Sequence, residues 1–320
     1  MGDVTMLGER CGMCGARALV PAARPDWLSC EWCGVESVRD AVRLPDLHAG
    51  RIEDQIPRGW HMDDYVARGW AAGQGFDYRA DRTERARGHS PERASGTLTR
   101  IEPATPLAVA LAILARDADD ELRGWLDMSA LPYNYGATVV VVDQSKTGDA
   151  LDGLPVKVVA HRLNGDFGKQ RDRAQAAVEA MPGIDWVLHV DTDEAIGLRI
   201  EGWLEGLTSI AEREGLDAIA LPRMNVVDGV CSDLWPDPQY RLVRATQRYD
   251  GRVHERPQAC RDWRRTMTVL SGGRGPEAAW TIHHALERTH VVARTQAYDA
   301  LGQDSDRRAD EEALLRPYTP

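Results

Sequence analysis

Several patterns are missing from this chain of 320 residues, and each absence excludes a class of protein. No stretch approaches the ~18 consecutive apolar residues of a membrane-spanning helix. The first residues, MGDVTMLGERCG, lack the charged-then-apolar order of a signal peptide. Lysine occurs only at positions 146, 157 and 169, and the net charge of −11 argues against a surface that is coated with nucleic acid throughout. We therefore expect a cytoplasmic protein without membrane contact.

Glycine-rich phosphate loops are also missing. No GxGxxG follows the first apolar run of the main domain, and neither GxxxxGKS nor GxxxxGKT occurs anywhere. A nucleotide phosphate would therefore have to be held by other groups.

Cysteine is scarce, but four of the six cysteines form two pairs, CGMC (Cys11, Cys14) and CEWC (Cys30, Cys33). This spacing is typical of a structural zinc site with four thiolate ligands, which leaves no open coordination position for catalysis. A glycine follows each pair and permits the tight turn that such a site needs. Disulfide or redox-active pairs are the weaker alternative in a chain without an export signal.

Composition divides the chain into three parts: a zinc ribbon (residues 1–45), a helical connector or linker (46–104), and a main domain (105–320). The connector ends in an arginine-rich stretch near Arg79 to Arg100. Both a solvated hinge and an arm that faces a polyanion fit this stretch.

Apolar runs alternate with helical patterns in the main domain. The runs are PLAVALAILA, ATVVVVDQS, PVKVVAH, DWVLHVDTD and DAIALP. Strands that are buried on both faces and alternate with helices predict an α/β fold, in which a mostly parallel sheet has helices on both sides.

Acidic residues follow two of these runs, at the sheet edge where ligands bind in such folds. Asp143 ends VVVVD, and Asp191 and Asp193 lie at the end of DWVLHVDTD. Two carboxylates at positions i and i+2 can bind Mn²⁺ or Mg²⁺, and the cation can then bind a diphosphate. Aspartates that only cap a helix are the alternative.

The order of the motifs VVVVDQSKTGDAL, GDFGKQRDRAQAAV, DWVLHVDTDE, DPQYRLVRATQRYDGRVHE and WTIHHAL resembles family-two glycosyltransferases of the GT-A fold, over roughly residues 105 to 295. The resemblance implies a Rossmann-like GT-A domain that uses a nucleotide-sugar, a UDP- or GDP-sugar. It further implies that Asp143 contacts the base or ribose and that Arg171 lies near the nucleotide. Asp191 and Asp193 match the DxD motif, with Asp193 the more direct metal ligand, and His283 or His284 completes the metal or diphosphate site.

Two departures from the family pattern bear on the reaction. Asp172 replaces the usual asparagine after the helix arginine, and the Gln-x-x-Arg-Trp signature of processive polymerases is absent. We therefore expect one sugar to be transferred per encounter. The base that removes the acceptor proton is Glu255 or Asp237, and His254 either orients the acceptor or packs in the core.

Nine arginines lie between Arg241 and Arg274, against three acids. Beside a presumed acceptor site this excess favours a polyanionic acceptor, although ion pairs with the rest of the chain explain it equally well. Together with the ribbon it resembles the TET-associated glycosyltransferases of phages. That resemblance implies a hydroxymethylated pyrimidine in DNA as acceptor, flipped out of the duplex, in a host cytoplasm.

Two other functions stay open. One is a glycosyltransferase that acts on protein, glycan or lipid, in which the ribbon only docks or stabilises. The other is a nucleic-acid-binding adaptor on an inactive transferase fold, against which the intact acidic and histidine residues argue.

Overall fold

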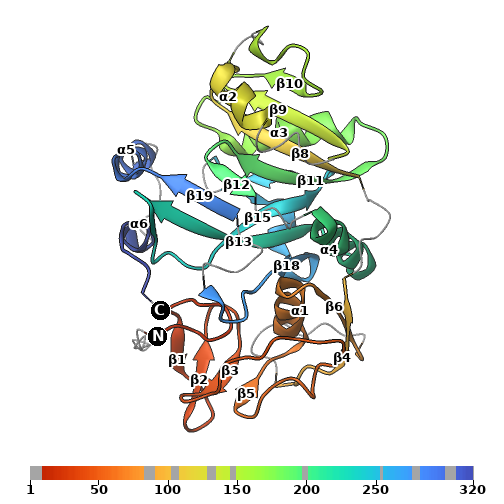
Figure 1. Cartoon of the computed structure of the whole chain (residues 1–320), viewed down its shortest axis with the longest axis vertical. Coiled ribbons are helices and arrows are strands. Elements are labelled where there is room, and N and C mark those ends of the chain that lie inside the picture. The colour runs from red at the N-terminus through yellow and green to blue at the C-terminus, as the bar shows by residue number, and fades with distance from the viewer. Residues whose placement is uncertain are drawn as a thin grey trace.

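The computed structural model describes residues 9–82, 91–101, 108–127, 135–144, 149–196, 201–252, 255–275, 282–299 and 308–319. Within these ranges the chain forms two bodies that lie against each other. The smaller body contains the N-terminal strands, and the larger is built around one long twisted sheet (Figure 1).

Two small antiparallel sheets form the N-terminal body, with the orders β1-β2-β3-β5 and β4-β7-β6. Helix α1 (Asp64–Gly73) packs against the second sheet and begins at Asp63, whose carboxylate accepts a hydrogen bond from the Val66 N–H at 3.0 Å. The strands are β1 Leu19–Pro21, β2 Trp27–Cys30, β3 Glu36–Val38, β4 Gly50–Arg51, β5 Trp60–His61, β6 Phe76–Ala80 and β7 Gly96–Arg100.

One hydrophobic core runs through this body, from Cys11 in the ribbon to Leu98 in β7. Most of the region expected as a connector is therefore folded. The expected linker near Arg79 to Arg100 differs most, because its described ends are the antiparallel strands β6 and β7. Tyr78 and Leu98 face each other across these strands and are buried, while Arg79 and Arg100 are exposed.

The large sheet has the order β10-β9-β8-β11-β15-β13-β19-β12, and β14 and β18 pair with β13. It is largely parallel, as the sequence predicts, but β15 runs antiparallel to both of its neighbours, and β12 and β14 run antiparallel to β19 and β13. The strands are β8 Ala108–Ala115, β9 Ala137–Val142, β10 Lys157–Ala160, β11 Ile184–Asp191, β12 Glu194–Ile196, β13 Ala218–Val227, β14 Val230–Cys231, β15 Asp237–Arg244, β18 Thr266–Thr268 and β19 Ile282–Leu286.

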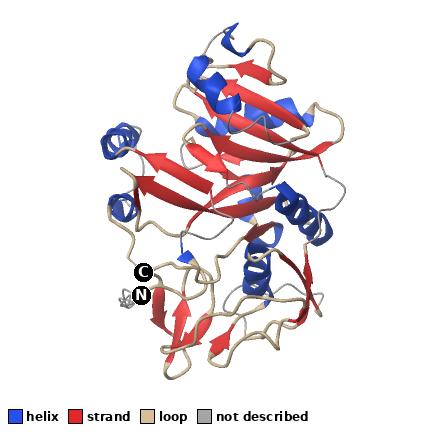
Figure 2. Cartoon of the chain, viewed as in Figure 1, coloured by secondary structure: helices blue, strands red, loops and turns tan. Residues whose placement is uncertain are grey.

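Helices cover both faces of this sheet (Figure 2). Trp186, Leu188 and Val190 of β11 face a core that includes α2 (Asp120–Trp125) and α4 (Glu201–Glu214), while Val187 faces α3 (Phe167–Glu179) on the other side. The remaining elements are α5 Arg288–Asp299, α6 Arg308–Leu315, the pair β16 Tyr249–Asp250 and β17 Arg256–Pro257, and the 3₁₀ turns Asp149–Leu151, Gln258–Arg261 and Trp263–Arg265. Among the described helices none is long and apolar enough to cross a membrane.

Arg10 joins the ribbon to the far end of the chain. Its guanidinium donates to the carbonyls of Thr319 at 2.7 Å and Gly15 at 2.8 Å, and it pairs with Asp233. It also lies 4.2 Å from the centre of the Tyr318 ring. The first and last described segments are therefore held together at the boundary between the two bodies.

Candidate functional site

The four ribbon cysteines converge, as their spacing predicts. All four are buried, and their sulfur atoms lie within 4.8 Å of one another. Gly15 and Gly34 adopt positive φ angles of 87° and 85°, which turn the chain after each pair. This geometry is that of a four-thiolate site for Zn²⁺. Burial raises the pKa of the Cys14 and Cys33 thiols, and a bound cation would favour their thiolate forms.

A second polar cluster lies at the end of β11, where the sequence predicts a cation. The positive charge next to Asp191 comes from the chain itself. Arg171 of α3 lies 3.2 Å from its carboxylate and Arg241 of β15 lies 2.7 Å away. Burial opposes the ionisation of Asp191, but the two guanidinium charges hold its pKa well below the ordinary value.

The same network continues along the sheet. Arg241 also contacts Glu194 at 2.5 Å, and Arg223 of β13 contacts Glu194 at 3.0 Å and Asp237 at 2.6 Å. Cross-strand register explains one of these pairs, because Arg223 and Asp237 are direct partners between β13 and β15. The carboxylates are thus arranged in a row with guanidinium groups between them.

Asp193 does not join this row but contacts His284, whose Nε2 lies 3.1 Å from its Oδ2. The other ring nitrogen of His284, Nδ1, lies 2.7 Å from Oδ1 of Asn225. The amide of Asn225 is oriented in turn, because its Nδ2 donates to Asp237 at 2.9 Å. An amide oxygen can only accept, so Nδ1 of His284 carries a proton that it donates to Asn225, and Nε2 faces Asp193.

Nε2 and the Asp193 carboxylate can be bridged at this distance by a proton or by a cation. Two ligands at right angles on one Mg²⁺ are separated by about 3 Å, given its usual bond lengths of about 2.1 Å. The contact between Asp193 and His284 therefore suits a shared divalent cation. Burial opposes ionisation of Asp193, but the hydrogen bond and charge of His284 lower its pKa below the ordinary value.

The structure brings only part of the predicted metal set together. His284 lies beside Asp193. His283, the residue before it in β19, is exposed and points to the opposite face of the sheet. Asp191 accepts hydrogen bonds from Arg171 and Arg241. Within the described ranges, the ribbon cysteines form the one group of three or more metal-ligating side chains that converge on a point.

The two candidates for the base differ in their hydrogen bonds. Both oxygens of Asp237 are used, one by Arg223 and Asn225 and the other by Gln239 at 2.6 Å. Burial opposes its ionisation, yet the Arg223 charge and these hydrogen bonds lower its pKa. Glu255 accepts a bond from Arg171 through Oε1 at 2.6 Å, and none of the described residues is hydrogen-bonded to its Oε2. His254 lies outside the described residues.

Asp143 and Asp172, which the sequence analysis discussed for the nucleotide site, lie at the edge of the cluster or away from it. Asp143 follows β9, and its Oδ1 accepts a hydrogen bond from the Leu163 N–H at 2.6 Å. It is not among the residues that line the cavities around Asp191. Asp172 accepts a bond from the Tyr249 N–H at 2.8 Å, and burial raises its pKa. Asp172 thus supports the β16 segment.

The arginine-rich segment is mostly neutralised by the chain's own acids. Seven of its nine arginines form ion pairs, which supports the alternative explanation of the excess charge. The paired residues are Arg241, Arg244, Arg248, Arg261, Arg264, Arg265 and Arg274.

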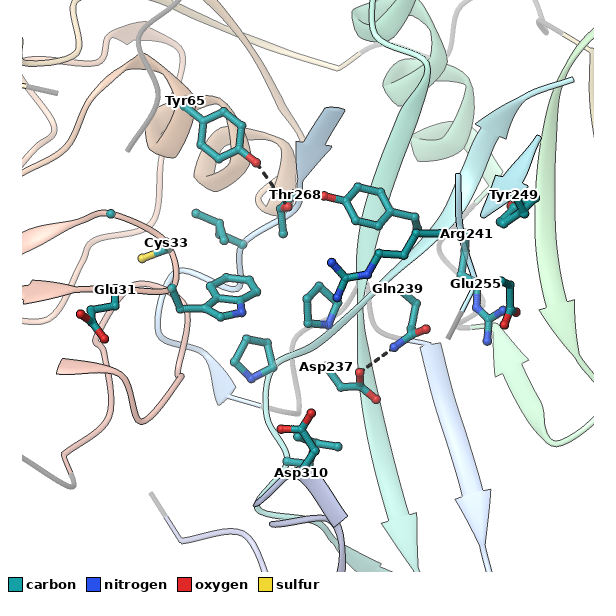
Figure 3. A pocket seen from close by; sticks show the side chains of 18 of the residues that line it. Glu31, Cys33, Tyr65, Asp237, Gln239, Arg241, Tyr249, Glu255, Thr268 and Asp310 are labelled. Carbon is teal, nitrogen blue, oxygen red and sulfur yellow. Dashed lines mark hydrogen bonds between the residues drawn. The ribbon is translucent and has the colours of Figure 1, made fainter. Parts of the chain in front are cut away.

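Two cavities that share lining residues adjoin the network. One of about 510 Å³ is lined by Asp191, Asp193, Asn225 and His284. The other, of about 730 Å³, extends from Glu255 to the ribbon residues Glu31 and Cys33. Figure 3 shows the second cavity, with the ribbon residues on one side and the side chains of Asp237, Gln239, Arg241 and Glu255 on the other. Arg171, Asp237, Arg241 and Glu255 line both cavities.

Several residues of the network were not predicted from the sequence, namely Glu194, Arg223, Asn225, Gln239 and Arg241. One signal was available. Polar residues alternate in DPQYRLVR, where Asp237, Gln239 and Arg241 share one face of a strand. The spacing of Arg223 and Asn225 repeats this pattern in β13.

Comparison with known proteins does not place the chain in a family. No protein-family model matches it, and no curated protein matches it in sequence. One similar solved structure, described as "Crystal Structure of a Mycobacterial Protein", is 14% identical; the match covers 59% of this chain and 71% of that chain, with a TM-score of 0.31. The class that the fold and sites define is a mixed α/β protein with a four-cysteine cluster.

Proposed function

We propose that this protein is a metal-dependent glycosyltransferase that moves one sugar from a nucleotide-sugar to a hydroxyl of a macromolecular acceptor. The observation that carries the proposal is the orientation of His284 by Asn225, which turns Nε2 toward Asp193. Charge supports it as well. The network holds five carboxylates and three guanidinium groups, and one divalent cation would balance the difference.

The bound cation, Mn²⁺ or Mg²⁺, would neutralise the diphosphate of the donor. Asp193 and His284 would hold it, and Asn225 would keep His284 in the required tautomer. Arg171 and Arg241 fix Asp191 at the cavity wall, where its half-buried carboxylate can accept a hydrogen bond from a donor hydroxyl. Asp193 lies in the turn between β11 and β12, and the other residues belong to four strands of one sheet and to helix α3, which packs on it.

Glu255 is the proposed base. It lines both cavities, so a hydroxyl that reaches the donor from the ribbon side passes beside it. Its Oε2 can take the proton, while Arg171 holds Oε1. Asp237 positions Arg223 and Asn225 instead, since both of its oxygens are already hydrogen-bonded.

Hydroxymethylated pyrimidine in DNA remains the proposed acceptor, but of the residues now proposed to bind its phosphates only Arg252 belongs to the arginine-rich segment. Four cationic side chains line a hollow of about 400 Å³ at the start of α3, with one acid among them. They are Arg162, Lys169, Arg173 and Arg252. Phosphates bound there would lie next to the segment that carries Glu255.

The first test is release of nucleoside diphosphate from a panel of UDP- and GDP-sugars in the presence of Mn²⁺. We expect hydrolysis by the wild-type protein, and a loss of about 100-fold in Asp193→Asn. Mn²⁺ binding, followed by electron paramagnetic resonance, should weaken in the same variant. Asp185→Asn, an exposed acid in β11, the strand that precedes Asp193, is the matched control. Hydrolysis that needs no metal, or none at all with any donor, would refute the proposal.

The acceptor is tested separately with DNA that contains 5-hydroxymethylcytosine or 5-hydroxymethyluracil, followed by mass spectrometry of the nucleosides. A sugar mass on a nucleoside is the expected result. Labelling of a protein, glycan or lipid with unchanged DNA would show the alternative transferase. DNA binding without hydrolysis of any donor would show the adaptor.

A further inference from the structure

The larger cavity has one wall that belongs to the zinc ribbon. Glu31, Trp32, Cys33 and Gly34, which form the second cysteine turn, line it opposite β15. Figure 3 shows Glu31 and Cys33 on this side, with Tyr65 and Thr268 closing the cavity between the two bodies. The ribbon is therefore part of the cleft that leads to Glu255.

Trp32 is unusual in its exposure. Its side chain is 37% exposed, and it is the one aromatic residue among the large apolar side chains that are exposed in the described chain. The turn that carries it is rigid. Cys30 and Cys33 are buried on either side, and the Gly34 N–H donates to the Cys30 carbonyl at 2.8 Å. An indole held in this way offers a flat apolar face to a ligand in the cleft.

We propose that Trp32 is an acceptor-binding residue on which the target pyrimidine stacks after it leaves the DNA helix. This inference rests on the proposed function and adds the residue that holds the acceptor ring. The ring would lie between the indole and the β15 wall, where Pro236 and Pro238 also line the cavity. Its hydroxymethyl group would then point toward Glu255.

A nucleobase is favoured over a neutral sugar ring because of what lies beside the cleft. The Phe167 N–H at the start of α3 donates to the Arg252 carbonyl at 2.7 Å, so the four-cation hollow adjoins the segment that leads to Glu255. A base in a DNA strand is attached to a phosphate backbone that these cations can bind, whereas a neutral sugar offers them no anionic group.

The experiment uses the full chain loaded with zinc and a fluorescein-labelled single-stranded oligonucleotide with one 5-hydroxymethylcytosine. Fluorescence anisotropy gives the Kd. Trp32→Ala should raise it at least about fivefold, because loss of one stacked base contact has that size, and Trp32→Phe should restore most of the affinity. Val42→Ala, another exposed apolar residue of the N-terminal body, should bind like the wild type. Zinc content is measured for every variant to show that the ribbon is intact.

The outcomes separate this inference from the proposed function. A wild-type protein without metal-dependent donor hydrolysis refutes the function, whatever Trp32 does. Hydrolysis together with equal oligonucleotide binding by wild type and Trp32→Ala, or with no oligonucleotide binding at all, refutes the stacking role. Binding of maltoheptaose that depends on Trp32, in competition with the oligonucleotide, would assign the cleft to a sugar acceptor and overturn the nucleobase.

Discussion

His189 lies two residues before Asp191, on the same face of β11, and is fully buried. Its ring contacts that of Tyr249 edge-on, with 5.4 Å between centres. Within the described chain neither ring nitrogen has a hydrogen-bond partner. Burial, followed by the charges of Arg171 and Arg241, lowers its pKa well below the ordinary value, so the folded protein keeps this histidine neutral.

This residue predicts a pH dependence of stability. The unfolded chain binds a proton at His189 near pH 6.5 but the folded chain does not, so stability falls as the pH drops below that value, by up to ~1.4 kcal/mol per unit. Between pH 7.5 and 5.0, the wild type should lose up to about 2 kcal/mol more than His189→Leu in urea unfolding. His48→Leu, at an exposed histidine, should keep the wild-type dependence. Equal dependence in wild type and His189→Leu would contradict this assignment.

Part of the site at this scale could be predicted from the sequence. Asp191 and Asp193 were found because they directly follow an apolar strand, and His284 because of its motif. Arg241 was counted only as part of a basic excess, since its burial between Asp191 and Glu194 depends on β15 lying next to β11. No local pattern contains that pairing, because the two strands are separated by α4 and β13 along the chain.

Helix α1 joins the N-terminal body to the large sheet through a glycine. A Cβ on Gly69 would lie 2.3 Å from the Thr268 carbonyl oxygen, and the Leu270 N–H donates to the Gly69 carbonyl at 3.0 Å. Gly124 in α2 has nothing within 4 Å of the same position. One substitution therefore has opposite effects in two helices.

Gly69→Ala should lower the free energy of unfolding by about 1–3 kcal/mol, because the helix must move away from β18. Gly124→Ala should raise it by up to about 1 kcal/mol through helix propensity alone. Urea unfolding of the two variants measures both values. An increase in stability for Gly69→Ala would show that α1 does not pack closely on β18.

Elements were predicted where burial on both faces gives a continuous apolar run, as in β8, β9 and β11. They were missed where one face is charged. β6 alternates Phe76, Tyr78 and Ala80 with Asp77 and Arg79, and such a mixture reads as polar linker unless its pairing with β7 is known. β15 was missed as a site element for a similar reason, since its polar face lines the cavity.

At the scale of the whole molecule, the cysteine cluster should stabilise the N-terminal body as well as the ribbon itself. The hydrophobic core of the ribbon is continuous with α1, and Leu270 from the sheet body belongs to this core. Cys30→Ser should remove the single zinc equivalent and lower the free energy of unfolding by more than about 4 kcal/mol. Elemental analysis and thermal unfolding provide the two measurements. Cys231→Ser, outside the cluster, should keep its zinc; a Cys30→Ser protein with full zinc and an unchanged midpoint would exclude the zinc site.

The clasp formed by Arg10 has a consequence for biosynthesis. Arg10 and its partner Thr319 are 309 positions apart. At a translation rate of about 5–20 residues per second, roughly 15–60 s separate the synthesis of Arg10 from the synthesis of Thr319. The ribbon can bind zinc during translation. The contact between the ribbon and the segment around Thr319, however, forms only after that segment has left the ribosome. The nascent protein should thus bind zinc well before the cavity beside the ribbon can bind a ligand.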